Sequence, residues 1–362
     1  MRKILTLFLL ALVVLAGLGW GLMQTPLTPP SECFVEIETG SSTLLIARQL
    51  EEASVLRTRY AFVVARLLRR GKLKAGEYRF TTPATPLQVY DRIARGDVYT
   101  IPITIPEGNN LYDIAARFEA SHFFPAADLL TAAHQQTSII SDLDPHATSL
   151  EGYLFPDTYL FPRHITAEQA VRAMVRRFRQ AAKTIGLAAP TRSTVVIASL
   201  IERETPIASE RPLVASVFQN RLARGMPLMS DPTVIYGLEL AGKWRGEIYA
   251  SDLDYDSPYN TYRHTGLPPG PVSNPGLSSL KAAMHPAQSD YLYFVAETAD
   301  PFGHSRFAAT LEEHNRNVVS YRKAEKAEMQ SEAPLPVVKK KAKKQARAIH
   351  KRPASHRKRA VH

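Results

Sequence analysis

Cysteine is nearly missing from this chain of 362 residues. Cys33 is the single thiol, so an intramolecular disulfide and a Cys-rich zinc site are excluded. The histidines are scattered and include no H-x-x-x-H pair, the spacing that places two zinc ligands on one helix face. A G-x-S-x-G motif, the nucleophile elbow of serine hydrolases, is also missing. The sequence therefore predicts no metal site and no cofactor.

Charge is absent from a long apolar run near the N-terminus. Arg2 and Lys3 precede this run, which extends from Ile4 to Met23 and would span about 30 Å as a helix, the thickness of a bilayer core. Residues 24–32 carry no Lys or Arg, so the positive-inside rule places the N-terminus in the cytoplasm and the body outside. A cleaved signal peptide is the alternative, but no convincing A-x-A cleavage site follows the run. We expect an uncleaved single transmembrane helix at 1–23 and a stiff Pro-rich spacer at 24–32.

Residues 33–148 contain two strand–turn–helix units of one design. The first unit has an alternating strand at 34–38, Gly40 and a helix, and the second has a strand at 101–105, Gly108 and a helix. Matching residues follow the two glycines at identical offsets: Ile46, Ala47, Leu50 and Glu51 in the first unit, and Ile114, Ala115, Phe118 and Glu119 in the second. A repeated unit is the simplest explanation for this match.

The segment between the two units predicts a basic helix at 57–71, a strand at 75–80 and a short helix at 86–95. A small α+β module of this kind resembles the LysM-like glycan-binding domain. A spacer domain without a ligand is the alternative. We expect residues 33–148 to form one LysM-like α+β region.

Residues 149–325 predict a second, helix-rich α+β domain. The segment 149–162 is rich in aromatic residues and proline, and would serve either as a stacking platform for sugar rings or as buried packing. A helix is expected at 165–185, and strands at 291–295 and 305–309 are expected to pair in a short antiparallel sheet. A closing helix is expected at 311–322. Residues 326–362 form a linker and a basic tail that its composition predicts to be disordered.

A helix in the middle of this domain carries a candidate general acid. Pro206 stops the helix, because the residue before a proline is pushed out of the α region. Glu204 shares one helix face with Ile197 and Leu200, whereas Glu202 points away from that face. A carboxyl group in an apolar setting at the negative end of a helix dipole keeps its proton to higher pH. Glu204 is thus prepared for general acid catalysis; a surface position on a frayed last turn is the alternative.

Polar and aromatic residues gather in the loops that follow. A helix capped by Ser209 is expected to run to Arg224, and the turn at 226–237 is expected to hold its polar residues in a loop. Proline and glycine at the density seen in 257–276 exclude regular structure and predict rigid loops suited to a ligand cleft. The candidate substrate-binding residues of these loops are Ser230, Asp231, Tyr259, Asn260 and Tyr262, with Asn274 in the same Pro/Gly-rich segment.

Several specific motifs occur in a fixed order through this domain. They are EGYLFPDTY at 151–159, IASLIERET at 197–205, SERPLVASVFQNRL at 209–222, SDPTVIYG at 230–237, YNTY at 259–262, GLPPGPVSNPG at 266–276, HP at 285–286 and YLYFV at 291–295. In these motifs the chain resembles the bacterial endolytic murein transglycosylases of the YceG-like group. The resemblance covers nearly the whole chain except the tail.

The resemblance implies a lyase that cleaves the β-1,4 bond between N-acetylmuramic acid and N-acetylglucosamine without water. In this family the catalytic glutamate stands directly before the threonine of an ET pair, which here is Glu204–Thr205. One glutamate then acts as acid and base, and the product is a 1,6-anhydro sugar. Asp231 is assigned to substrate positioning. Met229 departs from the family pattern, which has a glutamine before the Ser-Asp pair, and this puts one polar sugar contact in doubt.

The expected partners follow from these assignments. Peptidoglycan strands are the expected substrate, the resemblance implies action as a terminator of strand elongation at the cytoplasmic membrane, and penicillin-binding proteins are possible protein partners. A non-catalytic, membrane-anchored peptidoglycan-binding scaffold is the alternative function. The tail carries the whole excess of the net charge of +11 through Lys339, Lys340, Lys341, Lys343, Lys344, Arg347, Lys351, Arg352, Arg357, Lys358 and Arg359. Outside the cytoplasm we expect it to meet anionic lipids or acidic wall polymers, not nucleic acid, or no partner at all.

Overall fold

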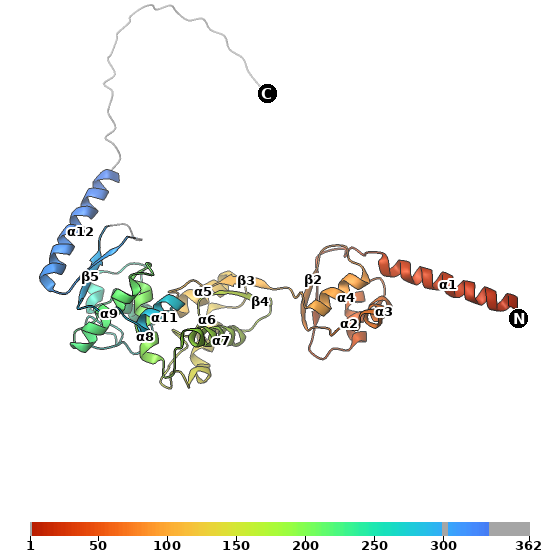
Figure 1. The fold of residues 1–362 in the computed structure, drawn as a ribbon, viewed down its shortest axis with the longest axis horizontal. Helices are drawn as coiled ribbons and strands as arrows, with labels where there is room; N and C mark the ends of the chain where they lie inside the picture. The colour runs from red at the N-terminus through yellow and green to blue at the C-terminus, as the bar shows by residue number, and fades with distance from the viewer. Residues whose placement is uncertain (1, 299–302, 333–362) are drawn as a thin grey trace, which may run out of the picture.

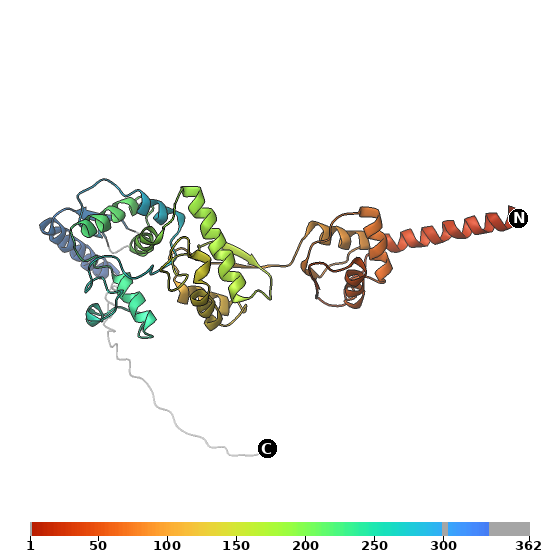
Figure 2. The same ribbon diagram turned by 90° about the horizontal axis from the view of Figure 1, so that it is seen from below.

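The computed structural model describes residues 2–298 and 303–332, and the predicted basic tail lies outside these residues. Helix α1 leads into a small α+β module, which a short connection joins to a larger helix-rich body (Figures 1 and 2). The strands are β1 (Cys33–Ile37), β2 (Gly76–Phe80), β3 (Ile101–Thr104), β4 (Thr158–Phe161), β5 (Tyr293–Ala296) and β6 (Ser305–Ala308). In the described residues they pair as two-stranded antiparallel sheets, β1 with β2, β3 with β4 and β5 with β6.

The helices account for most of the fold. They are α1 (Arg2–Gln24), α2 (Thr43–Glu52), α3 (Arg59–Arg69), α4 (Pro86–Arg95), α5 (Leu111–Ala120), α6 (Ala126–Gln135), α7 (Ala167–Ile185), α8 (Arg192–Glu204), α9 (Arg211–Ala223), α10 (Asp231–Leu240), α11 (Leu277–Met284) and α12 (Leu311–Glu332). Short 3₁₀ turns occur at Thr137–Ile140 and Ala250–Asp254. The predicted α+β class with a helix-rich second part is therefore confirmed.

Helix α1 coincides with the segment predicted to cross a membrane, and it projects away from the module in both views (Figures 1 and 2). Its described side chains include exposed apolar residues such as Leu10, Val13 and Trp20. However, no helix among the described residues is both long enough and apolar enough to cross a membrane. The expected transmembrane span at 1–23 is therefore not found in the structure.

The small module has its own hydrophobic core. Strands β1 and β2 pair with Val35 opposite Tyr78, and helices α2 and α3 lie between them in the chain. Phe62 of α3 and Tyr90 of α4 are fully buried in this core, which also takes in Met23 at the end of α1. The α+β elements expected between residues 33 and 95 are thus present, and the likeness to a LysM-like domain stays a prediction.

The second strand–turn–helix unit does not belong to this module. Strand β3 pairs with β4, with Ile103 opposite Tyr159, and Ile114 and Phe118 of α5 lie in the core of the larger body. The expected grouping of both units within 33–148 was therefore wrong, because the second unit buries its apolar face against residues beyond 148. The aromatic segment 149–162 also contributes to this core, since Tyr153 and Leu154 are fully buried. Of the two roles considered for this segment, these residues have the role of buried packing.

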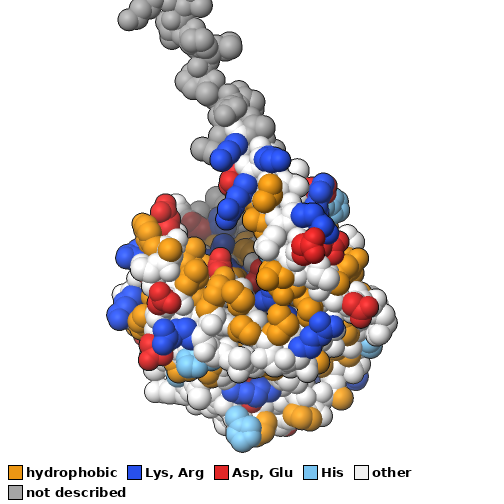
Figure 3. Space-filling model, turned by 90° about the vertical axis from the view of Figure 1, so that its left-hand side faces the viewer, with side chains coloured by type: hydrophobic (Ala, Val, Ile, Leu, Met, Phe, Trp, Pro, Cys, Tyr) orange, Lys and Arg blue, Asp and Glu red, His pale blue; other side chains and the backbone are white. Residues whose placement is uncertain are grey.

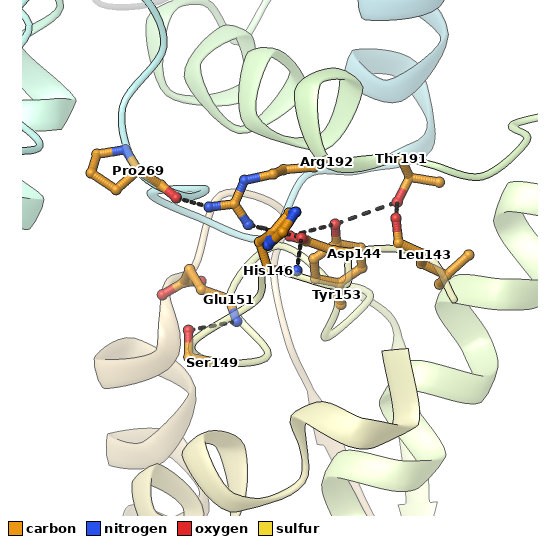
Figure 4. A network of polar contacts seen from close by, with 9 residues as sticks. All are labelled: Leu143, Asp144, His146, Ser149, Glu151, Tyr153, Thr191, Arg192 and Pro269. Carbon is orange, nitrogen blue, oxygen red and sulfur yellow. Dashed lines mark hydrogen bonds and ion pairs between the residues drawn. The ribbon is translucent and has the colours of Figure 1, made fainter. Parts of the chain in front are cut away.

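Helix α8 is the central element of the larger body. All residues from Val195 to Ile201 are buried, and α8 packs against α9, α10 and α11. A helix that is apolar all round must lie inside a protein. Figure 4 shows how its N-terminal end is fixed: Arg192 pairs with the buried Asp144 at 2.6 Å and also donates to the carbonyl of Pro269, while the Tyr153 hydroxyl donates to Asp144. These contacts hold the helix whose other end carries Glu204.

Several predicted boundaries differ from the observed ones. Glu210, not Ser209, is the N-cap residue of α9, and its carboxylate accepts a hydrogen bond from the backbone of Ser305 at 2.9 Å, which ties α9 to β6. Asp231 is the first residue of α10, so only Ser230 stays in the loop. The closing helix α12 extends ten residues past the expected end, to Glu332, and crosses the expected boundary at 325–326.

Candidate active site

Glu204 is the last residue of α8, and the chain leaves the helix at Thr205, which has extended backbone angles (φ −144°, ψ 131°). The following proline enforces this exit, as the sequence predicts. The Glu204 side chain is partly buried, and its Oε1 accepts a hydrogen bond of 2.6 Å from the Ser230 hydroxyl. The alternative of a frayed surface residue is therefore wrong.

The Glu204 carboxyl group lies in a cavity of about 410 Å³. The cavity is lined by Glu204, Phe218, Arg221, Leu228, Met229, Asp231, Tyr262, Tyr293, Phe294, Leu311 and His314. Figure 3 views this end of the molecule and shows a hollow beside the base of the projecting helix α12. A cavity of this size with a few polar groups among aromatic and aliphatic walls has the composition of a ligand site.

Burial raises the pKa of Glu204 to about 7. The Ser230 hydrogen bond and the positive charges of Arg221 and Arg203 lower it, and the negative charge of Asp231 raises it. Because a general acid works best with a pKa near the operating pH, this carboxyl group is suited to give and recover a proton near neutrality. The sequence-based expectation of partial burial and a raised pKa is confirmed.

Two loops predicted separately meet beside Glu204. The backbone N–H of Ser230 donates to the Thr261 hydroxyl oxygen at 3.0 Å, and the Thr233 and Thr261 hydroxyl groups are 2.9 Å apart. Met229 donates its backbone N–H to the Thr261 carbonyl at 3.2 Å. The buried threonines thus join the loop before α10 to the loop at 257–262, and this fixes the Ser230 hydroxyl against the Glu204 carboxylate.

Asp231 and Tyr262 form a second polar pair in the cavity wall. The Tyr262 hydroxyl donates to Asp231 Oδ1 at 2.5 Å, and both residues line the cavity. Burial, followed by this hydrogen bond to the carboxylate, raises the pKa of Tyr262, so the phenol stays protonated at neutral pH. This pair is available to orient a polar ligand.

Tyr259 and Asn260 lie outside the cavity wall. Asn260 is fully buried and donates to the carbonyl groups of Leu253 and Tyr255, at 2.8 Å each. The Tyr259 ring packs against the Tyr236 ring at a centroid distance of 5.0 Å. These two candidates hold the loop in shape rather than face the cavity. Asn274 is likewise buried.

Glu202 lies outside the Glu204 cavity and is held by other elements. Its side chain is only 3% exposed, it pairs with Arg211 at 2.8 Å, and it accepts a hydrogen bond from the backbone N–H of Gly276 at 2.8 Å. Burial raises the pKa of Glu202 above its ordinary value. Glu202 does point away from the Glu204 face, and there it meets α9 and the loop before α11.

Three cavity residues were not assigned a role from the sequence. Arg221 of α9 donates to the carbonyl groups of Leu292 and Leu228 at 2.7 Å each, and burial lowers its pKa. The His314 ring stacks on the Tyr293 ring at 5.1 Å, and burial lowers the pKa of His314, so the imidazole is neutral at pH 7. Arg221 and Tyr293 belong to motifs that the sequence displays, but His314 lies in α12 outside every motif.

Met229 stands at the mouth of the cavity. Its backbone is in the left-handed region (φ 52°), which is uncommon for a residue with a Cβ atom, and its side chain is half exposed. The thioether therefore presents an apolar surface at the position where the resemblance predicts a glutamine.

Comparison with known proteins agrees with the motifs. Residues 35–320 match the YceG-like family. An endolytic murein transglycosylase of Bacillus subtilis is 34% identical over 308 residues, which cover 79% of this chain and 84% of the relative. One of Streptococcus pneumoniae is 29% identical over 320 residues, 79% of this chain and 58% of the relative. A crystal structure of a yceG-like protein from Listeria monocytogenes, 35% identical, superposes with a TM-score of 0.52 over 79% of this chain and 99% of that one. The chain belongs to the YceG-like family.

Proposed function

We propose that this chain is a peptidoglycan lytic transglycosylase in which Glu204 is the single general acid and base. The observation that carries the proposal is the Glu204 carboxyl group itself, partly buried in a cavity with a pKa raised to about 7 and oriented by Ser230. The names of the relatives support the choice of murein as substrate.

The proposed reaction uses one carboxyl group twice. Protonated Glu204 gives its proton to the glycosidic oxygen between N-acetylmuramic acid and N-acetylglucosamine as the C1–O bond breaks. The resulting carboxylate takes the proton of the muramic acid C6 hydroxyl group, and the C6 oxygen forms a bond to C1. Glu204 ends protonated, no water is consumed, and the product carries a 1,6-anhydro ring. The Ser230 hydrogen bond stabilises the carboxylate between the two proton transfers.

Hydrolysis is the chemical alternative, and it needs a second carboxylate. Among the described residues that line this cavity, Asp231 is the one carboxylate besides Glu204. A hydrolase uses the second carboxylate as a nucleophile or to activate water. Asp231 instead accepts a hydrogen bond from Tyr262, which supports a positioning role.

The test is product analysis in oxygen-18 water. The purified full chain is incubated with peptidoglycan, and the fragments are analysed by mass spectrometry. We expect anhydro ends, one water lighter than reducing ends, without oxygen-18. Reducing ends that carry oxygen-18 would mean hydrolysis, and the absence of any fragment would favour the non-catalytic scaffold.

We place the enzyme outside the cytoplasmic membrane, anchored by α1, as a terminator of glycan strand elongation. Support for the anchor comes from the uncharged sequence between Ile4 and Met23 and from the exposed apolar side chains of α1. The test is a fusion of the C-terminus to a reporter that is active only outside the cytoplasm, and we expect this reporter to be active. Recovery of a mature chain that lacks residues 1–23 would contradict the anchor but not the export.

A further inference from the structure

Helix α3 has two apolar faces, and the core uses only one of them. Phe62 and Ala65 point into the module and are fully buried. The other face carries large apolar side chains that are widely exposed: Tyr60 at 69%, Val64 at 42%, Leu67 at 67% and Leu68 at 57%. These residues follow helical spacing, so they form one stripe along α3. Contiguous apolar surface of this kind marks an interaction site in a soluble domain.

The stripe continues onto the end of α1. A cavity of about 400 Å³ lies between the two helices, and its walls include Trp20 and Leu22 of α1 and Tyr60, Val64 and Leu68 of α3. Trp20 and Leu22 are themselves more than half exposed. This exposed apolar surface is therefore built from two helices, with an aromatic residue from each, and we call it the α1–α3 patch.

Basic residues border the α1–α3 patch. The segment from Arg57 to Lys74 contains seven Lys and Arg residues and no Asp or Glu. Arg59 pairs with Glu51, and Arg69 lies 3.6 Å from Asp91. Arg57, Arg70 and Lys72 make no ion pair with the described part of the chain, so their charge is free to attract an anionic surface.

We propose that the α1–α3 patch rests the small module on a membrane that contains anionic phospholipids. An amphipathic helix with aromatic and aliphatic side chains on one face and Lys or Arg beside them is the arrangement that binds at a lipid interface. Anionic headgroups satisfy the unpaired basic side chains, and the acyl boundary covers the apolar stripe.

The patch has a consequence for the larger body. The elements that line the Glu204 cavity, among them α9, β5 and α12, lie at the opposite end of the molecule from α1 (Figures 1 and 2). A module held on the lipid surface would therefore keep the cavity away from the bilayer at a set height. This inference rests on the proposed anchoring by α1 and does not depend on enzymatic activity.

The single cysteine makes a direct test practical. Cys33→Ser removes the native thiol while keeping a donor for its hydrogen bond to the Phe80 carbonyl. In that background, Leu67→Cys reports the patch, and Leu160→Cys, an equally exposed leucine of β4 in the larger body, is the matched control. Each full-length variant is spin-labelled and reconstituted in phosphatidylglycerol or phosphatidylcholine bilayers. The ratio of oxygen to nickel-chelate accessibility then reports contact with lipid.

In phosphatidylglycerol we expect the accessibility ratio at position 67 to exceed that at position 160 severalfold. Adding Arg70→Gln and Lys72→Gln should lower the ratio at position 67 in phosphatidylglycerol and leave it unchanged in phosphatidylcholine. Equal ratios at the two positions would overturn the proposal. Spin–spin broadening at position 67 that disappears on dilution with unlabelled protein would also overturn it, because a second copy of the chain would then cover the patch.

Discussion

The Ser230 hydroxyl donates a hydrogen bond of 2.6 Å to the Glu204 carboxylate, across 26 residues of sequence. Glu204 is the last residue of α8 and Ser230 is the N-cap residue of α10, so the contact depends on how these two helices pack. A charged acceptor makes this a stronger hydrogen bond than a neutral pair would form. It favours the carboxylate, whereas burial favours the protonated acid, and the balance sets the pKa near neutrality.

Glu204→Gln should abolish turnover without unfolding the protein. Glutamine keeps the shape of the side chain and an acceptor for Ser230 but cannot transfer a proton. Loss of general acid–base catalysis costs about 10²–10⁴-fold in rate, and we expect at least the upper value because one group serves both steps. The measurement is the release of anhydro products, with thermal melting to confirm folding.

Glu239→Gln is the matched control for that substitution. Burial raises the pKa of Glu239 to about 7 as well, and its Oε2 accepts a hydrogen bond of 2.6 Å from Asn110, but Glu239 does not line the Glu204 cavity. This variant should keep most of the activity. If both variants lost activity equally, the loss could not be assigned to proton transfer by Glu204.

The pH profile of kcat/KM should fall on the alkaline side with a pKa near 7. The first step needs protonated Glu204, so activity is present below this pKa and is lost as pH rises through it. The profile should be measured on the full chain between pH 5 and 9 with soluble glycan strands. A Glu204 variant with residual activity provides the control. If its profile kept the same alkaline limit, that limit would belong to another group.

Two neighbours should move this alkaline limit in opposite directions. Ser230→Ala removes the hydrogen bond that lowers the pKa of Glu204, so the limit should shift to higher pH. Asp231→Asn removes the negative charge that raises the pKa of Glu204, so the limit should shift to lower pH. Shifts in the same direction would contradict the electrostatic assignment.

Glu202→Gln should destabilise the fold rather than change the chemistry. Glu202 and Arg211 are 3% and 7% exposed, and breaking a buried pair by removing one charge costs about 3–5 kcal/mol. Urea unfolding should show this loss, while the residual folded enzyme keeps its turnover. Adding Arg211→Met should recover part of the stability, because no buried charge is then left unpaired; a fully additive double variant would argue against the pairing.

Asn260→Ala tests whether this buried amide is structural. The substitution leaves the carbonyl groups of Leu253 and Tyr255 without their donor, at a cost of about 1–3 kcal/mol. We expect a lower melting temperature and an unchanged KM, whereas Ser251→Ala, at an exposed serine nearby, should change neither. A large rise in KM at unchanged stability would return Asn260 to the substrate-binding residues.

The chain itself determined where α8 ends and which of its residues is suited to acid catalysis. Pro206 fixes the end of α8 through a local steric clash, and the apolar residues before Glu204 are enough to predict a raised pKa. Elements such as α4, α7 and the β5–β6 pair were also predictable, because capping residues, glycines and hydrophobic periodicity act over a few residues.

Only the tertiary structure decided how Glu202 and Glu204 differ. Both have raised pKa values. They differ because Glu202 contacts Arg211 and Gly276, whereas the partly buried Glu204 lines a cavity. The same limit explains why the sequence did not show that Asn260 lies outside the cavity wall, and why β3 was grouped with the wrong module. Periodicity states which side chains are buried, but the partner that buries each of them is set by contacts between segments far apart in the chain.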